Sequence, residues 1–421
     1  MIKIYLFIFI FIFLSSCGGD KEIIQNKKQI NLFEKNKIIN SELNTSLKIN
    51  LSTFVNNSFL NNNTNNNGNI IFDTEFDKKK IFKFKKIDGY SVFDPELIFT
   101  QDGNIIFFDG NGSIFKIDEE MKELWKVNHY SKKQRRLKPK LFFASNKKRL
   151  IISDTLSQIY SVNIDNGELI WKKYSNSSFN SNIVLSSDKI MVLDFDNVIR
   201  CFSLENGNEL WKFKTIDVFI KSEKKLSIIL NQETIYFTNN FGDVTALNIN
   251  DGSLQWQTPT QSNDNLLNSF GLNNSDLIFD KNTIYLSNNK NELFALDANT
   301  GIIKWKQNIN SSLKPTVSEG YLFTISDEGY LFVIETNSGK ILRITDAFKN
   351  LKKRHKFKPT GFILAKNKIY LSTNRGLMIM INIINGEIEN IHKLYNSKIS
   401  RSFINNKSIY VIKDNAISRY K

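Results

Sequence analysis

Residues with the types and spacing needed for catalysis or metal binding are scarce in this chain. Its three histidines, His129, His355 and His392, are scattered along the sequence and suggest neither a metal triad nor a Ser-His-Asp arrangement. The segment Gly110-Asn111-Gly112 fits a hairpin turn, so it does not indicate a glycine-rich phosphate-binding loop. The sequence therefore predicts a protein without catalytic residues, metal ligands or a cofactor.

Cys17 is the residue to which the sequence assigns specific chemistry. The apolar run at residues 4–14 is too short for a membrane-spanning helix, which needs roughly 20 residues, but it suits the hydrophobic region of a secretory signal peptide. This run leads into Leu14-Ser15-Ser16-Cys17, which resembles the lipobox of bacterial lipoproteins. The resemblance implies that residues 1–16 are removed and that Cys17 becomes the diacylated first residue. The alternative is an ordinary signal peptide with a chance cysteine.

The segment after the cysteine has the composition of a tether. From about residue 19 to residue 68 it is rich in Asn, Lys and Ser, with low hydrophobicity and no sustained periodicity. We therefore predict a lipidated N-terminus and flexible tether over residues 17–78. The second cysteine, Cys201, has no intramolecular partner once Cys17 is lipidated, and we expect it to be a small buried hydrophobe.

The rest of the chain is a repeat of apolar runs separated by Asn-, Asp- and Gly-rich turns. The clearest unit runs from Thr283 to Trp305 and places Gly301 four residues before its tryptophan. The same pair recurs at Gly167 and Trp171, Gly207 and Trp211, and Gly252 and Trp256. Other units carry Met121 at the glycine position or Arg343 and Asn390 at the tryptophan position. The units are of propeller-blade size, and alternating apolar residues indicate strands.

These units predict an all-β protein, an eight-bladed β-propeller of four-stranded antiparallel blades. The glycine suits a turn that requires a positive φ, and the tryptophan can cover the gap between blades. The eighth unit, residues 408–420, lacks an outer strand, whereas residues 80–87 form a lone strand before the first unit. We expect this N-terminal strand to pair with the last blade and close the ring over residues 79–421.

The unit Ala295-Leu296-Asp297 through Gly301 to Trp305 resembles the PQQ-type propeller repeat. A lipobox followed by a single eight-bladed domain is similar to the BamB family, lipoproteins of the machinery that folds β-barrels into bacterial outer membranes. The resemblance implies a non-enzymatic protein that is lipid-anchored in the outer membrane and faces the periplasm. It implies binding to the periplasmic POTRA domains of the barrel-forming subunit, BamA, and no small-molecule substrate.

The resemblance also implies contact residues. In the family, an apolar-x-apolar-basic segment after the third blade meets the partner, and here the matching residues are Val218, Ile220 and Lys221. The alternative is that these residues form the inner strand of the fourth blade. A second family contact, an acidic segment after the fourth blade, corresponds to residues 272–276, with Asn274 where the family has an acid.

The formal charge of +15 is concentrated in two basic loops, residues 132–140 and 352–358. This charge is explained either by attraction to an acidic partner or anionic membrane surface, or by drift in composition. Nucleic acid is not an expected partner of an exported protein. Two other functions stay open: a quinone-dependent dehydrogenase on the same fold, and a propeller that binds another envelope protein or a polysaccharide.

Overall fold

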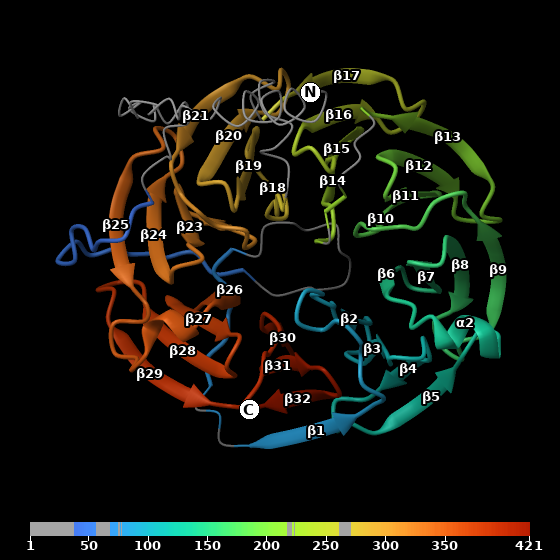
Figure 1. Cartoon of the computed structure of the whole chain (residues 1–421), viewed down its shortest axis with the longest axis horizontal. Helices are drawn as coiled ribbons and strands as arrows, with labels where there is room; N and C mark the ends of the chain where they lie inside the picture. The colour runs from blue at the N-terminus through green and yellow to red at the C-terminus, as the bar shows by residue number, and fades with distance from the viewer. Residues whose placement is uncertain are drawn as a thin grey trace, which may run out of the picture. The chain divides into compact units, whose positions relative to one another are not determined.

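The structure, a computed structural model, describes residues 38–55, 68–74, 76, 78–216, 221–222, 224–260 and 271–421. In this part of the chain, eight four-stranded sheets stand around a ring, as Figure 1 shows. Neighbouring strands within each sheet are antiparallel. The predicted eight-bladed β-propeller is therefore confirmed.

Each of the first seven blades runs in chain order from an inner to an outer strand. Blades one to four are β2–β5 (Ile98–Phe99, Ile105–Phe108, Ile114–Ile117, Glu123–Val127), β6–β9 (Leu141–Ser145, Arg149–Asp154, Gln158–Asn163, Leu169–Tyr174), β10–β13 (Val184–Ser186, Lys189–Leu193, Val198–Ser203, Glu209–Lys214) and β14–β17 (Ile228–Asn231, Thr234–Thr238, Val244–Asn248, Leu254–Thr258).

Blades five to seven are β18–β21 (Ile278–Asp280, Thr283–Asn288, Glu292–Asp297, Ile303–Gln307), β22–β25 (Thr316–Ser318, Tyr321–Ile325, Tyr330–Glu335, Ile341–Asp346) and β26–β29 (Pro359–Ala365, Lys368–Thr373, Leu377–Asn382, Ile388–Lys393). The eighth combines β30–β32 (Phe403–Asn405, Ser408–Lys413, Ala416–Tyr420) with β1 (Lys79–Lys83). Regular helix in the described residues is confined to α2 (Lys132–Arg136) and η2 (Arg354–Lys356).

Stacking of the blades explains the burial pattern of their strands. The third strand of a blade, such as β12, is buried on both faces because a neighbouring blade covers each of them. The outer strand β13 instead alternates between exposed and half-buried side chains, because its outward face meets solvent. Cys201 lies on β12 and is fully buried in an apolar cluster, as the sequence predicted.

A tryptophan and a glycine turn form the junction between neighbouring blades. The Trp171 indole Nε1 donates a hydrogen bond to the Leu204 carbonyl of the next blade at 3.2 Å, and its ring covers Gly207. Gly207 has φ +72°, and a Cβ atom there would lie 2.5 Å from the Trp171 ring. The other indoles bond in the same way: Trp125 to Ile164, Trp211 to Ile249, Trp256 to Ala298, and Trp305 to Thr336.

Arg343 occupies the junction between the sixth and seventh blades, where the tryptophan is missing. It is fully buried, and its guanidinium donates to the Ile383 and Ile384 carbonyls beside the next glycine turn. It also donates to the Leu47 carbonyl at 2.9 Å. Burial lowers the pKa of Arg343 to about 10. Three carbonyl oxygens thus take the place of water around this cation.

The N-terminal strand closes the ring as predicted. β1 pairs with β32 in antiparallel register, from Lys79 opposite Tyr420 to Lys83 opposite Ala416, at the lower edge of Figure 1. The Phe82 ring lies 4.8 Å from the ring of Phe115 in the first blade. Because β1 belongs to the eighth sheet and packs on the first blade, it joins the two ends of the ring.

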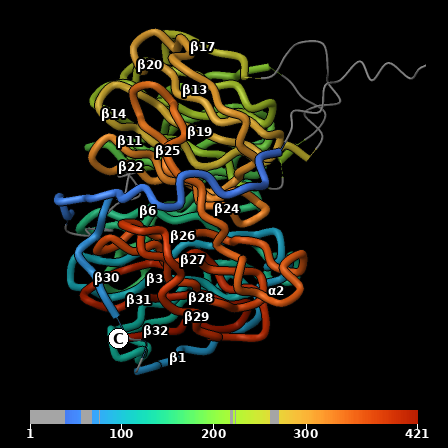
Figure 2. The backbone as a smooth tube through the Cα atoms, turned by 90° about the vertical axis from the view of Figure 1, so that its left-hand side faces the viewer, coloured from blue at the N-terminus to red at the C-terminus, as the bar shows by residue number. Residues whose placement is uncertain are grey.

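Two parts of the predicted tether instead lie on the propeller. Residues 38–55 and 68–74 follow the side of the ring, where Figure 2 shows the blue tube in front of the blades. Ile49 and Leu51 are buried in the apolar cluster of the sixth and seventh blades, and Ile70 and Phe72 in that of the seventh and eighth. Each pair places two apolar residues on one face of an extended chain, which explains the binding of an otherwise polar segment.

We predict that Gly207→Ala lowers the free energy of unfolding by about 2–3 kcal/mol, because the new methyl group overlaps the Trp171 ring at a positive φ. Gly320→Ala is the matched control: its φ is +82°, but the added Cβ meets nothing nearer than 3.9 Å. Chemical denaturation of both variants measures the difference. An equal loss in the two variants would contradict the role given to the tryptophan contact.

Phe82→Ala should lower the free energy of unfolding by about 2 kcal/mol, because it removes a half-buried ring from the closure of the eighth and first blades. Ile81→Ala, one residue earlier and on the exposed face of β1, should cost less than about 0.5 kcal/mol. Thermal and chemical denaturation test the pair. A larger effect of Ile81→Ala would show that β1 does not pack as described.

Candidate partner-binding site

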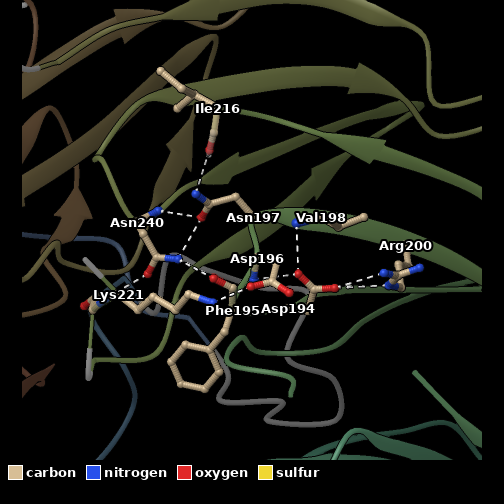
Figure 3. Close-up of polar contacts among 10 residues, drawn as sticks. Asp194, Phe195, Asp196, Asn197, Val198, Arg200, Ile216, Lys221 and Asn240 are labelled. Carbon is tan, nitrogen blue, oxygen red and sulfur yellow. Dashed lines mark hydrogen bonds and ion pairs between the residues drawn. The ribbon is translucent and has the colours of Figure 1, made fainter. Parts of the chain in front are cut away.

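The connection between β13 and β14 crosses one face of the ring and carries Lys221. The inner strand of the fourth blade begins at Ile228, so Lys221 lies in the connection and not in that strand. Lys221 is exposed, and its ammonium pairs with the Asp196 carboxylate in the β11–β12 turn, as Figure 3 shows. This hydrogen bond is the main cause that lowers the pKa of Asp196. Val218 and Ile220 lie outside the described residues.

Two buried asparagines hold this part of the face in place. Asn197 donates from Nδ2 to the Ile216 carbonyl at 3.0 Å, and its Oδ1 accepts the Asn240 backbone N–H at 2.9 Å. Asn240 accepts the backbone N–H of Ser222 at 2.9 Å. The turns of two neighbouring blades are thereby fastened to both ends of the connection that carries Lys221.

Asp194 shapes the turn beneath the Lys221–Asp196 pair. Its Oδ1 accepts the backbone N–H groups of Asp196 and Val198, and its Oδ2 accepts two N–H groups of Arg200 at 3.1 and 3.2 Å. Burial raises the pKa of Asp194, while the hydrogen bonds and Arg200 oppose this rise. These bonds fix the backbone of the turn, which leaves Asp196 directed toward Lys221 (Figure 3).

Asn274 is placed differently from Lys221. It is only 8% exposed, bridges to Asn288 in the fifth blade, and its Oδ1 is buried without a hydrogen-bond partner. The two connections nevertheless touch, because the Ser222 hydroxyl donates to the Leu272 carbonyl at 3.3 Å. As the side chain lies, Asn274 offers little surface to a partner.

Asp196 and Asn240 belong to this site, and the sequence analysis did not identify them. Both lie in Asn- and Asp-rich hairpin turns, which is the ordinary composition of such turns. One signal was present: in a four-stranded blade the turn between the second and third strands lies on the same face as the inter-blade connections. Asp196 could therefore have been placed beside residues 215–227.

The histidines and Cys201 are not brought together. His129 shares a hydrogen bond with the Gly167 carbonyl, His392 lies against Phe76, and His355 is in η2. Burial raises the pKa of Cys201 to about 12. Among the described residues no group of three or more His, Cys, Asp or Glu side chains could hold a metal ion.

Two further findings bear on the membrane predictions. No helix in the described part of the chain is both long and apolar enough to cross a membrane. Cys17 and the predicted signal peptide lie outside the described residues.

Known structures share this fold. The crystal structure of BamB from Moraxella catarrhalis is similar with a TM-score of 0.67 and 14% sequence identity, covering 81% of this chain and 98% of that one. The computationally designed Ika8 protein is similar with a TM-score of 0.59 and 13% identity, covering 80% of this chain and 99% of that one. At these identities the likeness shows the fold alone.

Comparison at the level of sequence families is more specific. No curated protein matches the chain. The family described as outer membrane protein assembly factor BamB matches residues 110–345, which is more than half of the 421 residues and reaches from the first blade to the sixth. The chain therefore belongs to the family of the outer membrane protein assembly factor BamB.

Proposed function

We propose that this protein is a non-catalytic scaffold lipoprotein of the outer-membrane β-barrel assembly machinery. It is anchored through Cys17 in the outer membrane, faces the periplasm and binds the POTRA domains of a BamA-like subunit. Through this contact it aids the insertion of outer-membrane proteins. The observation that carries the proposal is the BamB family match over residues 110–345.

The geometry of the β13–β14 connection supports the location of the contact. It begins after Lys214, the last residue of β13, and includes the exposed Lys221. The connection is bonded to turns of the third and fourth blades through Asn197 and Asn240. A connection held at both ends loses less conformational freedom on binding than a free loop does, which favours affinity.

The chemistry of the three proposed contact residues suits a protein partner. If the partner binds this segment in an extended conformation, Val218 and Ile220 share one face and can enter an apolar groove together. Lys221 can then exchange its pairing with Asp196 for an acidic group of the partner. The exposed charge pair costs little to open, since such pairs contribute about 0–1 kcal/mol.

Neither alternative function gains a specific observation from the structure. Quinone-dependent dehydrogenases on this fold typically carry two adjacent cysteines, whereas this chain has cysteines only at positions 17 and 201. A propeller that binds polysaccharide would be expected to expose aromatic rings for stacking. The five tryptophans are half-buried at the blade junctions, whereas Tyr174 at the end of β9 is an exposed ring.

The contact is tested by affinity capture from detergent-solubilised outer membranes. The native protein should retain the BamA-like subunit, and a Val218→Glu, Ile220→Glu, Lys221→Glu variant should retain at least about tenfold less, because carboxylates replace its apolar and basic groups. Lys212→Glu is the control: it is an exposed lysine of the same blade, on the outer strand β13. It should bind like the native protein.

Capture by the triple variant at the native level would move the contact to another surface of the same complex. Failure of the native protein itself to capture the subunit would overturn the proposed partner. The enzyme alternative is tested by measuring the Tm of the native protein with and without quinone and calcium. A ligand that binds only the folded state raises the Tm, so an unchanged Tm at saturating ligand contradicts the enzyme alternative.

Lipid anchoring is tested by cell fractionation. Cys17→Ala should move the protein from the membrane fraction to the soluble fraction, because acyl chains supply the proposed attachment. Cys201→Ala removes the other cysteine, which is buried in the third blade, and should leave the protein on the membrane. Membrane retention of Cys17→Ala would contradict the anchor.

A further inference from the structure

The central channel opens on the same face as Lys221 and is lined there by charged side chains. They come from segments that immediately precede inner strands, so five different blades contribute to one cavity of about 60 Å³. Its charged lining consists of Asp94, Glu96, Lys224, Lys225, Asp276, Lys314 and Arg401. A wider pocket of about 320 Å³ shares Asp94 and Lys224 with it and gives access from solvent.

The acidic groups of this cavity already have basic partners. Glu96 Oε1 lies 2.9 Å from Lys225 Nζ and 3.1 Å from an Arg401 guanidinium nitrogen. Asp276 lies 3.9 Å from the same Lys225 ammonium, and Asp94 pairs with Lys398 at 2.7 Å. Lys225 and Arg401 hold the pKa of Glu96 well below its usual range.

Two lysines of the cavity are left without a carboxylate at ion-pair distance among the described residues. Lys224 donates to the Ser312 carbonyl, two positions before Lys314 in the chain. Burial lowers the pKa of Lys224, and the charges of Asp276, Asp94 and Asp327 oppose this from beyond ion-pair distance. Lys314 makes no hydrogen bond or ion pair with any described residue. Two cations therefore face one small cavity, with neighbouring Lys225 and Arg401 already engaged.

If these side chains only closed the channel through ion pairs, two lysines would not be left without a carboxylate partner. Burial of an ammonium group without a counter-ion is costly, so a purely structural network would be expected to match its charges. By size, the cavity holds about four to six waters at 10–15 Å³ each, which is comparable to the five heavy atoms of a tetrahedral phosphate. Size and charge therefore point to the same kind of ligand.

We propose that the channel mouth is a phosphate-binding site in which Lys224 and Lys314 contact the oxyanion. Arg401 and Lys225 are held by Glu96 at its edge and add to the positive potential. The phosphate group is either free inorganic phosphate or the headgroup of a small phosphate ester. The proposal is independent of the partner contact at Lys221.

Titration calorimetry and thermal melting with inorganic phosphate test the site. Phosphate at tenfold Kd should raise the Tm by about 2 °C relative to chloride at equal ionic strength. Lys314→Met should weaken phosphate binding at least about tenfold. Lys352→Met removes the same charge from an exposed position of a basic loop and should bind phosphate like the native protein.

The same variants separate binding from a structural role. In phosphate-free buffer Lys314→Met should melt at or above the native temperature, because it removes an unpaired cation from a crowded cavity. Glycerol 3-phosphate distinguishes the two sources: binding of both ligands shows recognition of the phosphate group, and binding of inorganic phosphate alone shows an enclosed site. No phosphate response in the native protein, an equal response in Lys314→Met, or a lower Tm of Lys314→Met without phosphate overturns the proposal.

Phosphate affinity should also fall as the pH rises through about 8. Burial and the neighbouring Arg401 lower the pKa of Lys314 to about 8; Lys225 acts in the same direction, and Asp276 and Glu96 oppose it. Above this pH the ammonium loses its proton and one of the two contacts loses its charge. Calorimetry from pH 8 upward, where inorganic phosphate is already almost entirely the dianion, measures the change, and an affinity that rises with pH there contradicts the role of Lys314.

Discussion

The contact between an outer-strand tryptophan and the glycine turn of the next blade is the interaction on which the rest of the structure depends. A four-stranded blade cannot cover both of its own faces, and each junction must therefore exclude water without a covalent link. The indole ring packs against the glycine, and the indole N–H donates a hydrogen bond to the carbonyl three residues before that glycine. Where a tryptophan covers the turn, a Cβ atom at the glycine would overlap the indole ring.

A buried arginine at one of these junctions connects the ring to its N-terminal segment. Arg343 reaches the Ile383 carbonyl, which matches the acceptor of an indole, and its other terminal nitrogen bonds the carbonyls of Ile384 and Leu47. Residues 38–55 and 68–74 then follow the sixth, seventh and eighth blades toward β1, which closes the ring. Docking of the N-terminal segment and closure of the propeller are therefore consecutive parts of one path.

Most of the fold was predictable because its signals are local and repeated. The spacing of glycine and tryptophan gave the blades, and the unpaired strand before the first unit gave the closure. The docking of Ile49 and Phe72 was not predictable, because isolated apolar residues in an Asn-rich stretch do not indicate by themselves that the folded ring has an apolar surface for them to pack against. Asp196 and the channel cluster were missed for a related reason: both join residues from different blades, and charge pairing across blades leaves no periodic trace in the sequence.

The rigid ring gives the connection between β13 and β14 two different environments. Its outer part carries Lys221 beside Asp196, and its inner part carries Lys224 and Lys225 at the channel. Asn180 bonds the Ser222 and Lys224 carbonyls, which fixes the inner part to the third blade. A partner on this face would therefore meet a preorganised edge and not a free loop.

Hydrogen–deuterium exchange of the full chain, with and without the POTRA region of a BamA-like subunit, tests this account most directly. We expect slower exchange in residues 215–227 and in the turn around Asp196, with exchange in the outer strands unchanged because the blades do not rearrange. Slower exchange confined to the opposite face, or no change at saturating partner, would contradict the account.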